Sequence, residues 1–282
     1  MKDLPKRTLT AIIFGAVMLG GILWNRISFS VLVVLMQTGC LFEYFRLVSP
    51  FQNYSDGKKK IVFIVSIIAC SAILLVVVFS QSDSLSAIYG VFAVPVFFFL
   101  LAAELFYGSE KPFLNGLLNA AAAIYITVPM IFFYSLADAP FLGSTNGWFP
   151  DNASVPLGVV LLIWANDTFA YFTGSLIGKH KMLPAVSPKK SWEGFFGGLI
   201  FTLVTAWVLS EYFPKPDLIH WMVVAAIVVF FGTAGDFFES MIKREAGVKD
   251  SGNLMPGHGG FLDRFDALIF CLPFVMIYLS LG

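Results

Sequence analysis

The sequence predicts an all-α integral membrane protein that crosses the bilayer about nine times, with its N-terminus in the cytoplasm. Of its 282 residues, 58% are hydrophobic and 13% are charged, about half the charged fraction of a soluble domain. The mean hydropathy is +0.82, and apolar runs of roughly 20 residues, enough to cross a bilayer, recur along the chain. The net charge is zero, so the total charge says nothing about partners, and no nucleic-acid partner is expected.

The candidate spans follow one another with short connections. Only Asn25 and Arg26 separate the first two, which predicts a tight helical hairpin. We divide the chain into N-terminal membrane helices, 1–112, and a C-terminal part, 113–282, which carries the polar loops 178–194 and 240–260. The spans fall near 8–25, 27–45, 61–80, 86–107, 113–137, 155–177, 194–212, 218–239 and 261–280.

The basic residues predict the orientation of these spans. With the N-terminus inside, 15 of the 18 Lys and Arg residues fall on the cytoplasmic side, and only Arg26 and Lys215 fall outside. Arg264 stands at the start of the last span. Cytoplasmic loops carry an excess of Lys and Arg, so this asymmetry supports the orientation and an odd number of spans.

The three cysteines predict no disulfide framework and no metal site. Cys40, Cys70 and Cys271 all lie in apolar segments without ligand spacing, as expected of small buried residues.

Carboxylates occur inside or at the ends of several spans, where charges are costly. Asp167 lies in the sixth span, Asp236 and Glu239 end the eighth, and Asp263 and Asp266 begin the ninth. The last two pairs are each spaced by three residues, which places both members on one face of a helix. Two helices joined by a loop are therefore expected to present paired carboxylates toward one point.

Two interpretations of these acids stay open. Hard oxygen ligands beside basic loops suit Mg²⁺ bound with a nucleoside triphosphate. Alternatively, each acid pairs with a nearby base, for example Asp263 with Arg244 or Arg264. Glu43 could likewise pair with Arg46, and Glu104 could be either a structural hydrogen-bonding group or part of the site.

The two cytoplasmic loops combine bases, glycines and a proline. Such loops can hold phosphate through backbone N–H groups and lysine charge. Ordinary positively charged cytoplasmic loops would explain the lysines but not the adjacent carboxylates. His258 is flanked by glycines in Pro-Gly-His-Gly-Gly, so it could approach a ligand closely, or it could be a turn histidine without a role.

Other enzyme classes find no support in the sequence. There is no Gly-x-x-x-x-Gly-Lys-Ser/Thr and no Gly-x-Ser-x-Gly, which disfavours a P-loop NTPase and an α/β-hydrolase. We see no internal repeat, which weakens the alternative of an ion-coupled secondary transporter.

The segment 240–266 holds four bases, four acids and a histidine within 27 residues. Its pattern is formed by Ser240, Lys243, Arg244, Lys249, Asp250, Pro256, His258, Gly259, Gly260, Asp263, Arg264 and Asp266. This pattern resembles the signature of the phosphatidate cytidylyltransferase (CDP-diacylglycerol synthase) family. Segments 166–178 and 187–194 also look like this family, and so does Glu43-Tyr-Phe-Arg-Leu47.

The resemblance implies transfer of CMP from CTP to phosphatidate, giving CDP-diacylglycerol and pyrophosphate. It implies an all-helical, dimeric, Mg²⁺-dependent enzyme of the inner (plasma) membrane, with its active site facing the cytoplasm. Carried over by motif, Asp236, Asp263 and Asp266 are the expected metal ligands, and a monovalent cation such as K⁺ is an implied second ion. The related alternative is a CTP-dependent polyprenol or lipid kinase.

The remaining site residues are expected to bind substrate. His258 would orient a phosphate. Asp167 and Glu193 would shape the site or bind ribose or the second cation. The expected phosphate-binding bases are Lys189, Lys190, Lys243, Arg244, Lys249 and Arg264. Further substrate contacts are expected from Ser187, Ser191, Asp250, Gly259 and Gly260.

Overall fold

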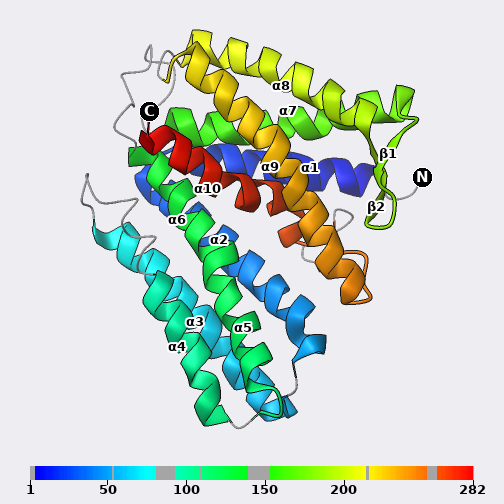
Figure 1. The fold of residues 1–282 in the computed structure, drawn as a ribbon. Coiled ribbons are helices and arrows are strands. Elements are labelled where there is room, and N and C mark those ends of the chain that lie inside the picture. Colours follow the sequence, from blue (N-terminus) through cyan, green and yellow to red (C-terminus); the bar gives the residue numbers. More distant parts are fainter. Residues whose placement is uncertain are drawn as a thin grey trace. The chain divides into compact units, whose positions relative to one another are not determined.

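The computed structural model of the chain (Figure 1) describes residues 4–52, 54–80, 93–107, 109–138, 153–213, 216–252 and 259–281. Within these ranges nearly every residue lies in a helix, in agreement with the predicted all-α membrane class. His258 and residues 86–92 of the predicted fourth span lie outside the described residues.

In the part of the chain that the structure describes, six helices are long and apolar enough to cross a membrane. These are Arg26–Phe51, Gly57–Phe79, Pro112–Ser135, Ser154–Ile177, Trp192–Tyr212 and Leu218–Glu245. Three shorter apolar helices, Thr8–Leu23, Val94–Phe106 and Asp266–Leu281, lie where the other three spans are predicted. The protein is thus of the multi-pass membrane class, while the count of nine spans stays a prediction.

The chain forms two compact units, each assembled from separate segments. Unit 1 comprises Met1–Gly21, Arg26–Ser135 and Ile242–Phe265, and unit 2 comprises Ile22–Asn25, Leu136–Met241 and Asp266–Gly282. The predicted division into 1–112 and 113–282 is contiguous, unlike these units, and stays a prediction.

Unit 1 is a helical bundle. Its helices are α1 (Leu4–Leu23, whose end passes into unit 2), α2 (Arg26–Val48), α3 (Asp56–Ser80), α4 (Ala93–Tyr107), α5 (Pro112–Ala122) and α6 (Val128–Ser135). A π-helical turn, Ala123–Thr127, joins α5 to α6, so the fifth predicted span is one helical rod. A 3₁₀ turn, Ser49–Phe51, ends α2.

Buried polar side chains are bonded inside this bundle. The Gln37 side chain donates to the Cys70 carbonyl over 2.9 Å. Buried Glu104 accepts hydrogen bonds from Asn119 (3.0 Å), Ser109 (3.2 Å) and Tyr54. Of the two roles left open for Glu104, the structure therefore shows the structural one.

Unit 2 contains α7 (Ser154–Ile177), α8 (Trp192–Tyr212), α10 (Asp266–Leu281) and α9 (Leu218–Glu245) up to Met241. Helices α7 and α8 pack along each other (Figure 1). Small residues permit this contact: a Cβ added at Gly198 would lie 2.6 Å from Asn166 Oδ1. Helices α9 and α10 meet through Phe231 and Phe274, whose rings stack with centroids 3.5 Å apart.

A β-hairpin occupies the loop 178–194, which the all-α prediction missed. Strands β1 (Lys181–Leu183) and β2 (Ser187–Ser191) pair antiparallel, and the Val186 amide donates to the Leu183 carbonyl over 3.2 Å to close the turn. The strands lack the apolar alternation that marks a strand in sequence, so backbone pairing alone defines them.

The prediction that Asp263 and Asp266 share one helix face is wrong. Asp263 lies in a 3₁₀ turn, Leu262–Arg264, whereas Asp266 begins α10. Phe265 between them has φ −121° and ψ 2°, which departs from helical geometry. The break also divides the units, because unit 1 ends at Phe265.

Candidate active site

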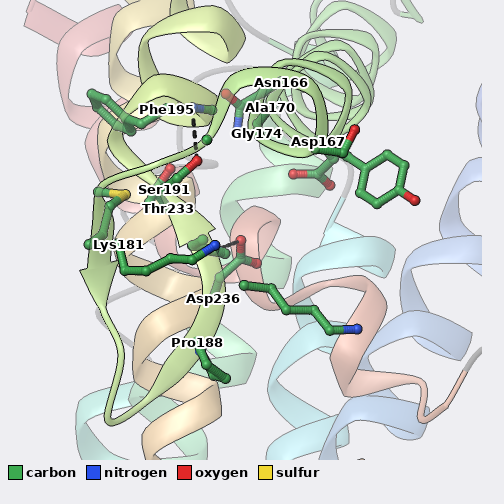
Figure 2. A pocket seen from close by; sticks show the side chains of 17 residues that line it. Asn166, Asp167, Ala170, Gly174, Lys181, Pro188, Ser191, Phe195, Thr233 and Asp236 are labelled. Atoms are coloured by element: carbon green, nitrogen blue, oxygen red, sulfur yellow. Dashed lines mark hydrogen bonds and ion pairs between the residues drawn. The ribbon is translucent and has the colours of Figure 1, made fainter.

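A pocket of about 550 Å³ lies in unit 2, between α7, the hairpin, the start of α8 and α9 (Figure 2). It gathers residues from the segments 166–178 and 187–194 and from the end of the eighth predicted span. Five predicted site residues line it: Asp167, Lys189, Lys190, Ser191 and Asp236. Lys181 and Thr233 also line it; Lys181 belongs to the predicted basic loop 178–194, whereas no sequence motif had marked Thr233.

Lys190 and Asp236 form an ion pair within this pocket. The ammonium group also lies 4.9 Å from the centroid of the Phe237 ring. About a quarter of the Asp236 side chain and a third of that of Lys190 stay exposed, so a ligand can reach both. Lys181 and Lys189 are exposed and add positive charge, which suits a phosphorylated ligand.

Ser191 fixes the hairpin to the start of α8. It is the N-cap residue of α8, and its hydroxyl accepts a hydrogen bond from the Gly194 amide over 3.2 Å. Close to this cap, α7 and α8 touch through glycines. A Cβ at Gly178 would lie 2.5 Å from Ser191 Oγ, and a Cβ at Gly194 would lie 2.8 Å from the Ala170 carbonyl oxygen.

Two predicted residues of this segment do not line the pocket. Ser187 begins β2, opposite Leu183. Glu193 instead holds His180: its carboxylate lies 2.6 Å from His180 Nδ1 and accepts from the His180 amide at 3.1 Å. In the structure, Glu193 thus secures the base of the hairpin.

Three carboxylates of unit 2 are electrostatic neighbours. Asp266 interacts with both Asp236 and Glu239, and Asp266 and Glu239 are buried. Like charges in a buried position repel one another, and a cation relieves that repulsion. Asp236 and Asp266 thus bring together carboxylate oxygens, the ligand type that a hard divalent cation prefers.

The signature segment contributes a second cluster, in unit 1, centred on Asp263. One carboxylate oxygen accepts from the amides of Ser251 (3.1 Å) and Gly260 (2.7 Å). The other oxygen pairs with Lys243. Asp263 was expected either to bind metal or to pair with Arg244 or Arg264, and in the structure it forms an ion pair with Lys243.

Glu43, on α2, is attached to the same segment. It is fully buried, and one of its oxygens accepts from the Ser251 hydroxyl (2.6 Å) and the Leu262 amide (2.8 Å). Its other oxygen has no hydrogen-bond partner among the described residues. Arg46, the partner considered from sequence, lies instead over the Phe42 ring, 5.9 Å from its centroid. The sequence signal for Glu43 was the presence of a carboxylate inside a predicted span.

The glycines of the signature leave room for these carboxylates. Gly259 has φ +84°, and a Cβ there would lie 2.8 Å from Asp263 Oδ2. A Cβ at Gly260 would lie 1.9 Å from Ser251 Oγ and 2.4 Å from Glu43 Oε2. Both positions therefore require glycine, for backbone conformation at the first and for space at the second.

Four further predicted residues of the signature lie at the surface of unit 1. Arg244 is exposed, and its guanidinium donates to the Val248 carbonyl over 3.1 Å. Lys249, Asp250 and Arg264 are exposed as well. Within the described ranges, no group of three or more His, Cys, Asp or Glu side chains has an arrangement that could by itself hold a metal ion.

The fold and these clusters define a class: a multi-pass membrane protein with a basic, carboxylate-containing pocket suited to a phosphorylated ligand. A model of the Cytidylyltransferase family matches residues 5–281. The chain belongs to this family, which confirms the family inferred from the signature.

Curated relatives agree with the family match. The phosphatidate cytidylyltransferase of Bacillus subtilis (strain 168) is 31% identical over 291 residues, covering 100% of this chain and 99% of the relative. The enzyme of that name from Staphylococcus haemolyticus is 35% identical over 214 residues, covering 74% and 77%. That from Staphylococcus saprophyticus is 47% identical over 121 residues, covering 42% and 46%.

Proposed function

We propose that this chain is a phosphatidate cytidylyltransferase, which transfers CMP from CTP to phosphatidate and releases pyrophosphate. The observation that carries this proposal is the similarity to the Bacillus subtilis enzyme along the full length of both chains. The product, CDP-diacylglycerol, serves phospholipid synthesis.

The reaction needs no nucleophilic side chain. A phosphate oxygen of phosphatidate attacks the α-phosphorus of CTP and forms the new P–O bond. The bond between the α-phosphorus and the α–β bridging oxygen breaks, and its electron pair leaves with pyrophosphate. The main work of the protein is therefore to align two anions and to stabilise the charge that develops.

The pocket of unit 2 supplies groups suited to that work. Lys189 and Lys190 would bind phosphate oxygens, with Lys181 as a third cation on the same hairpin. Ser191 would hold the hairpin in place through its cap. Asp167, on the α7 wall of the pocket, would bind ribose or a second cation such as K⁺.

The signature segment would bind the remaining phosphates. Its bases Lys243, Arg244, Lys249 and Arg264 would neutralise the triphosphate and the phosphatidate headgroup. His258 would orient a phosphate rather than act as an essential base, because the attacking phosphate is already ionised. In the described part of this segment, Asp263 accepts hydrogen bonds from the amides of Ser251 and Gly260.

We propose that Mg²⁺ is the divalent cation and that Asp236, Asp263 and Asp266 hold it. When bound, it would neutralise phosphate charge and polarise the P–O bond. The buried neighbours Asp266 and Glu239 beside Asp236 support this role. Lys190 and Lys243, which pair with two of the three acids, would then turn toward substrate phosphates.

We also propose the membrane placement and assembly. Nine spans with the N-terminus inside would place the loops 178–194 and 240–260 in the cytoplasm, where CTP is available. Phosphatidate would come from the plasma membrane in which the spans lie. The homodimer is proposed from the family resemblance alone.

The decisive experiment measures turnover of CTP labelled at the α-phosphate, with phosphatidate and Mg²⁺ in detergent, by the intact chain and by Asp263→Asn. We expect a labelled CDP-lipid and released pyrophosphate from the intact chain, and loss of both products in the variant. Chelation of Mg²⁺ should stop the reaction as well.

The other outcomes distinguish the alternatives. Labelled CDP together with a phosphorylated lipid would identify a CTP-dependent lipid kinase, which transfers the γ-phosphoryl group. Absence of CTP consumption with any lipid phosphate would contradict the enzyme assignment and favour the transporter, in which membrane acids relay ions.

A further inference from the structure

A second pocket, of about 360 Å³, lies in unit 1 where the chain passes from α2 to α3. Its lining includes Arg46 in the last turn of α2 and Lys59 and Lys60 near the start of α3. Among the described residues, no acidic side chain lines it, and none forms an ion pair with any of these three bases. Among the side chains that the structure describes, the pocket is therefore lined by three bases and no acid.

Two buried polar side chains, Gln52 and Asn119, also line this pocket. Gln52, 8% exposed, donates to Asn119 over 2.7 Å, and Asn119, 1% exposed, donates to Glu104 over 3.0 Å. Tyr54 and Ser109 complete the hydrogen bonds to Glu104. Because Glu104 is occupied by these donors and does not line the pocket, it leaves the three bases available to an external anion.

The pocket lies near the ends of two membrane-type helices. The membrane-type helix that contains α2 ends at Phe51, and the next begins at Gly57, so the bases lie at the adjacent ends of two spans. Basic residues at the ends of spans attract anionic lipids. Basic residues that flank any membrane span would also attract anionic lipids, but they would do so without lining a pocket.

An apolar surface leads away from the bases along α3. Phe63 and Ile64 line the pocket, and Ile68 and Leu75 continue the exposed face of the helix at spacings of four and seven residues, which keeps them on one side. A phosphate bound by the bases would thus have its acyl chain beside an apolar stripe.

We propose that this pocket binds an anionic phospholipid, with the headgroup phosphate on Arg46, Lys59 and Lys60 and an acyl chain along Ile64, Ile68 and Leu75. The bound lipid is additional to the substrates of the transferase. The proposal uses no residue of the active site, so it stands or falls independently of the proposed function.

The test uses the intact chain in neutral detergent, titrated with dioleoylphosphatidylglycerol, which carries a phosphodiester. Binding is measured as the number of lipids retained in native mass spectrometry and as the shift in thermal unfolding followed by tryptophan fluorescence. Dioleoylphosphatidylcholine and inorganic phosphate are the comparison ligands.

Two variants remove bases of the pocket: the double variant Lys59→Gln/Lys60→Gln and the single variant Arg46→Gln. The control variant is Lys111→Gln, because Lys111 is exposed at the start of α5 and lies outside the pocket.

We expect one retained phosphatidylglycerol, and an apparent affinity about thirtyfold lower in the double variant, since each interfacial base contributes on the order of 1 kcal/mol. Arg46→Gln should weaken binding about fivefold, and Lys111→Gln should bind as the parent does. Unchanged affinity in both pocket variants would overturn the proposal, as would equal weakening by Lys111→Gln or equal binding of phosphatidylcholine. Inorganic phosphate acting at the same concentrations would assign the pocket to a free anion instead.

Discussion

At the scale of single residues, Lys190 is the group on the hairpin best placed to act on a phosphate. We predict that Lys190→Ala lowers kcat/KM for CTP about 10²- to 10³-fold, because a preorganised charged donor is lost where negative charge develops. Initial rates measured against CTP concentration give the value. Lys179→Ala is the matched control, since Lys179 is exposed and does not line the pocket. Similar rates in the two variants would contradict a phosphate-binding role for Lys190.

Glu43 illustrates a different residue-scale effect, because it acts through the backbone of the signature segment. Glu43→Ala would leave the Ser251 hydroxyl and the Leu262 amide without their acceptor, at a cost of about 1–3 kcal/mol for each buried donor. We therefore expect a lower unfolding temperature and lower transferase activity. Glu43→Gln keeps an acceptor oxygen and should recover part of both.

Exposed Glu110 provides the control for Glu43. Glu110→Ala should leave the unfolding temperature and the rate unchanged, both measured in the same detergent. A Glu43→Ala protein as stable and active as the Glu110→Ala protein would show that α2 does not hold the signature segment.

At the scale of elements, the close contact of α7 and α8 shapes the unit 2 pocket. Gly194→Ala would force a methyl group to within 2.8 Å of the Ala170 carbonyl oxygen. We expect a loss of about 1–3 kcal/mol in stability and a raised KM for CTP, because α8 carries the hairpin with it. Thermal unfolding and steady-state rates measure both. Gly15→Ala, where nothing lies within 4 Å of the added Cβ, should be neutral or slightly stabilising, and an equal effect at both glycines would contradict the packing argument.

An element could be predicted from sequence only where its own residues carry a recognisable pattern. The membrane helices were predictable because hydropathy averages over about 20 residues. The hairpin was not, since its strands are exposed and polar and depend on pairing of the backbone. The turn between Asp263 and Asp266 was missed for a related reason: spacing indicates a shared face only while one helix continues through both positions.

In the candidate site, the sequence indicated several of the functional residues but not the residues with which they pair. Lys190, Asp236 and Asp263 could be identified from sequence because they are charged residues in an apolar chain, and charge near a membrane is costly. Their partners were not marked: Lys243 rather than Arg244 pairs with Asp263, and Glu43 bonds a segment more than 200 residues away in sequence. Partners of this kind are set by packing, which no local pattern reports.

At the scale of the whole molecule, the predicted orientation places residue 24 outside and residue 181 in the cytoplasm. Both side chains are exposed, Trp24 by 81%, and the native cysteines are all buried, so background reactivity should be low. We predict that a membrane-impermeant maleimide labels Trp24→Cys in intact cells, whereas Lys181→Cys reacts only after the membrane is permeabilised. The reverse pattern would place the hairpin outside, away from cytoplasmic CTP. Labelling of both in intact cells would contradict an odd number of spans between the two positions.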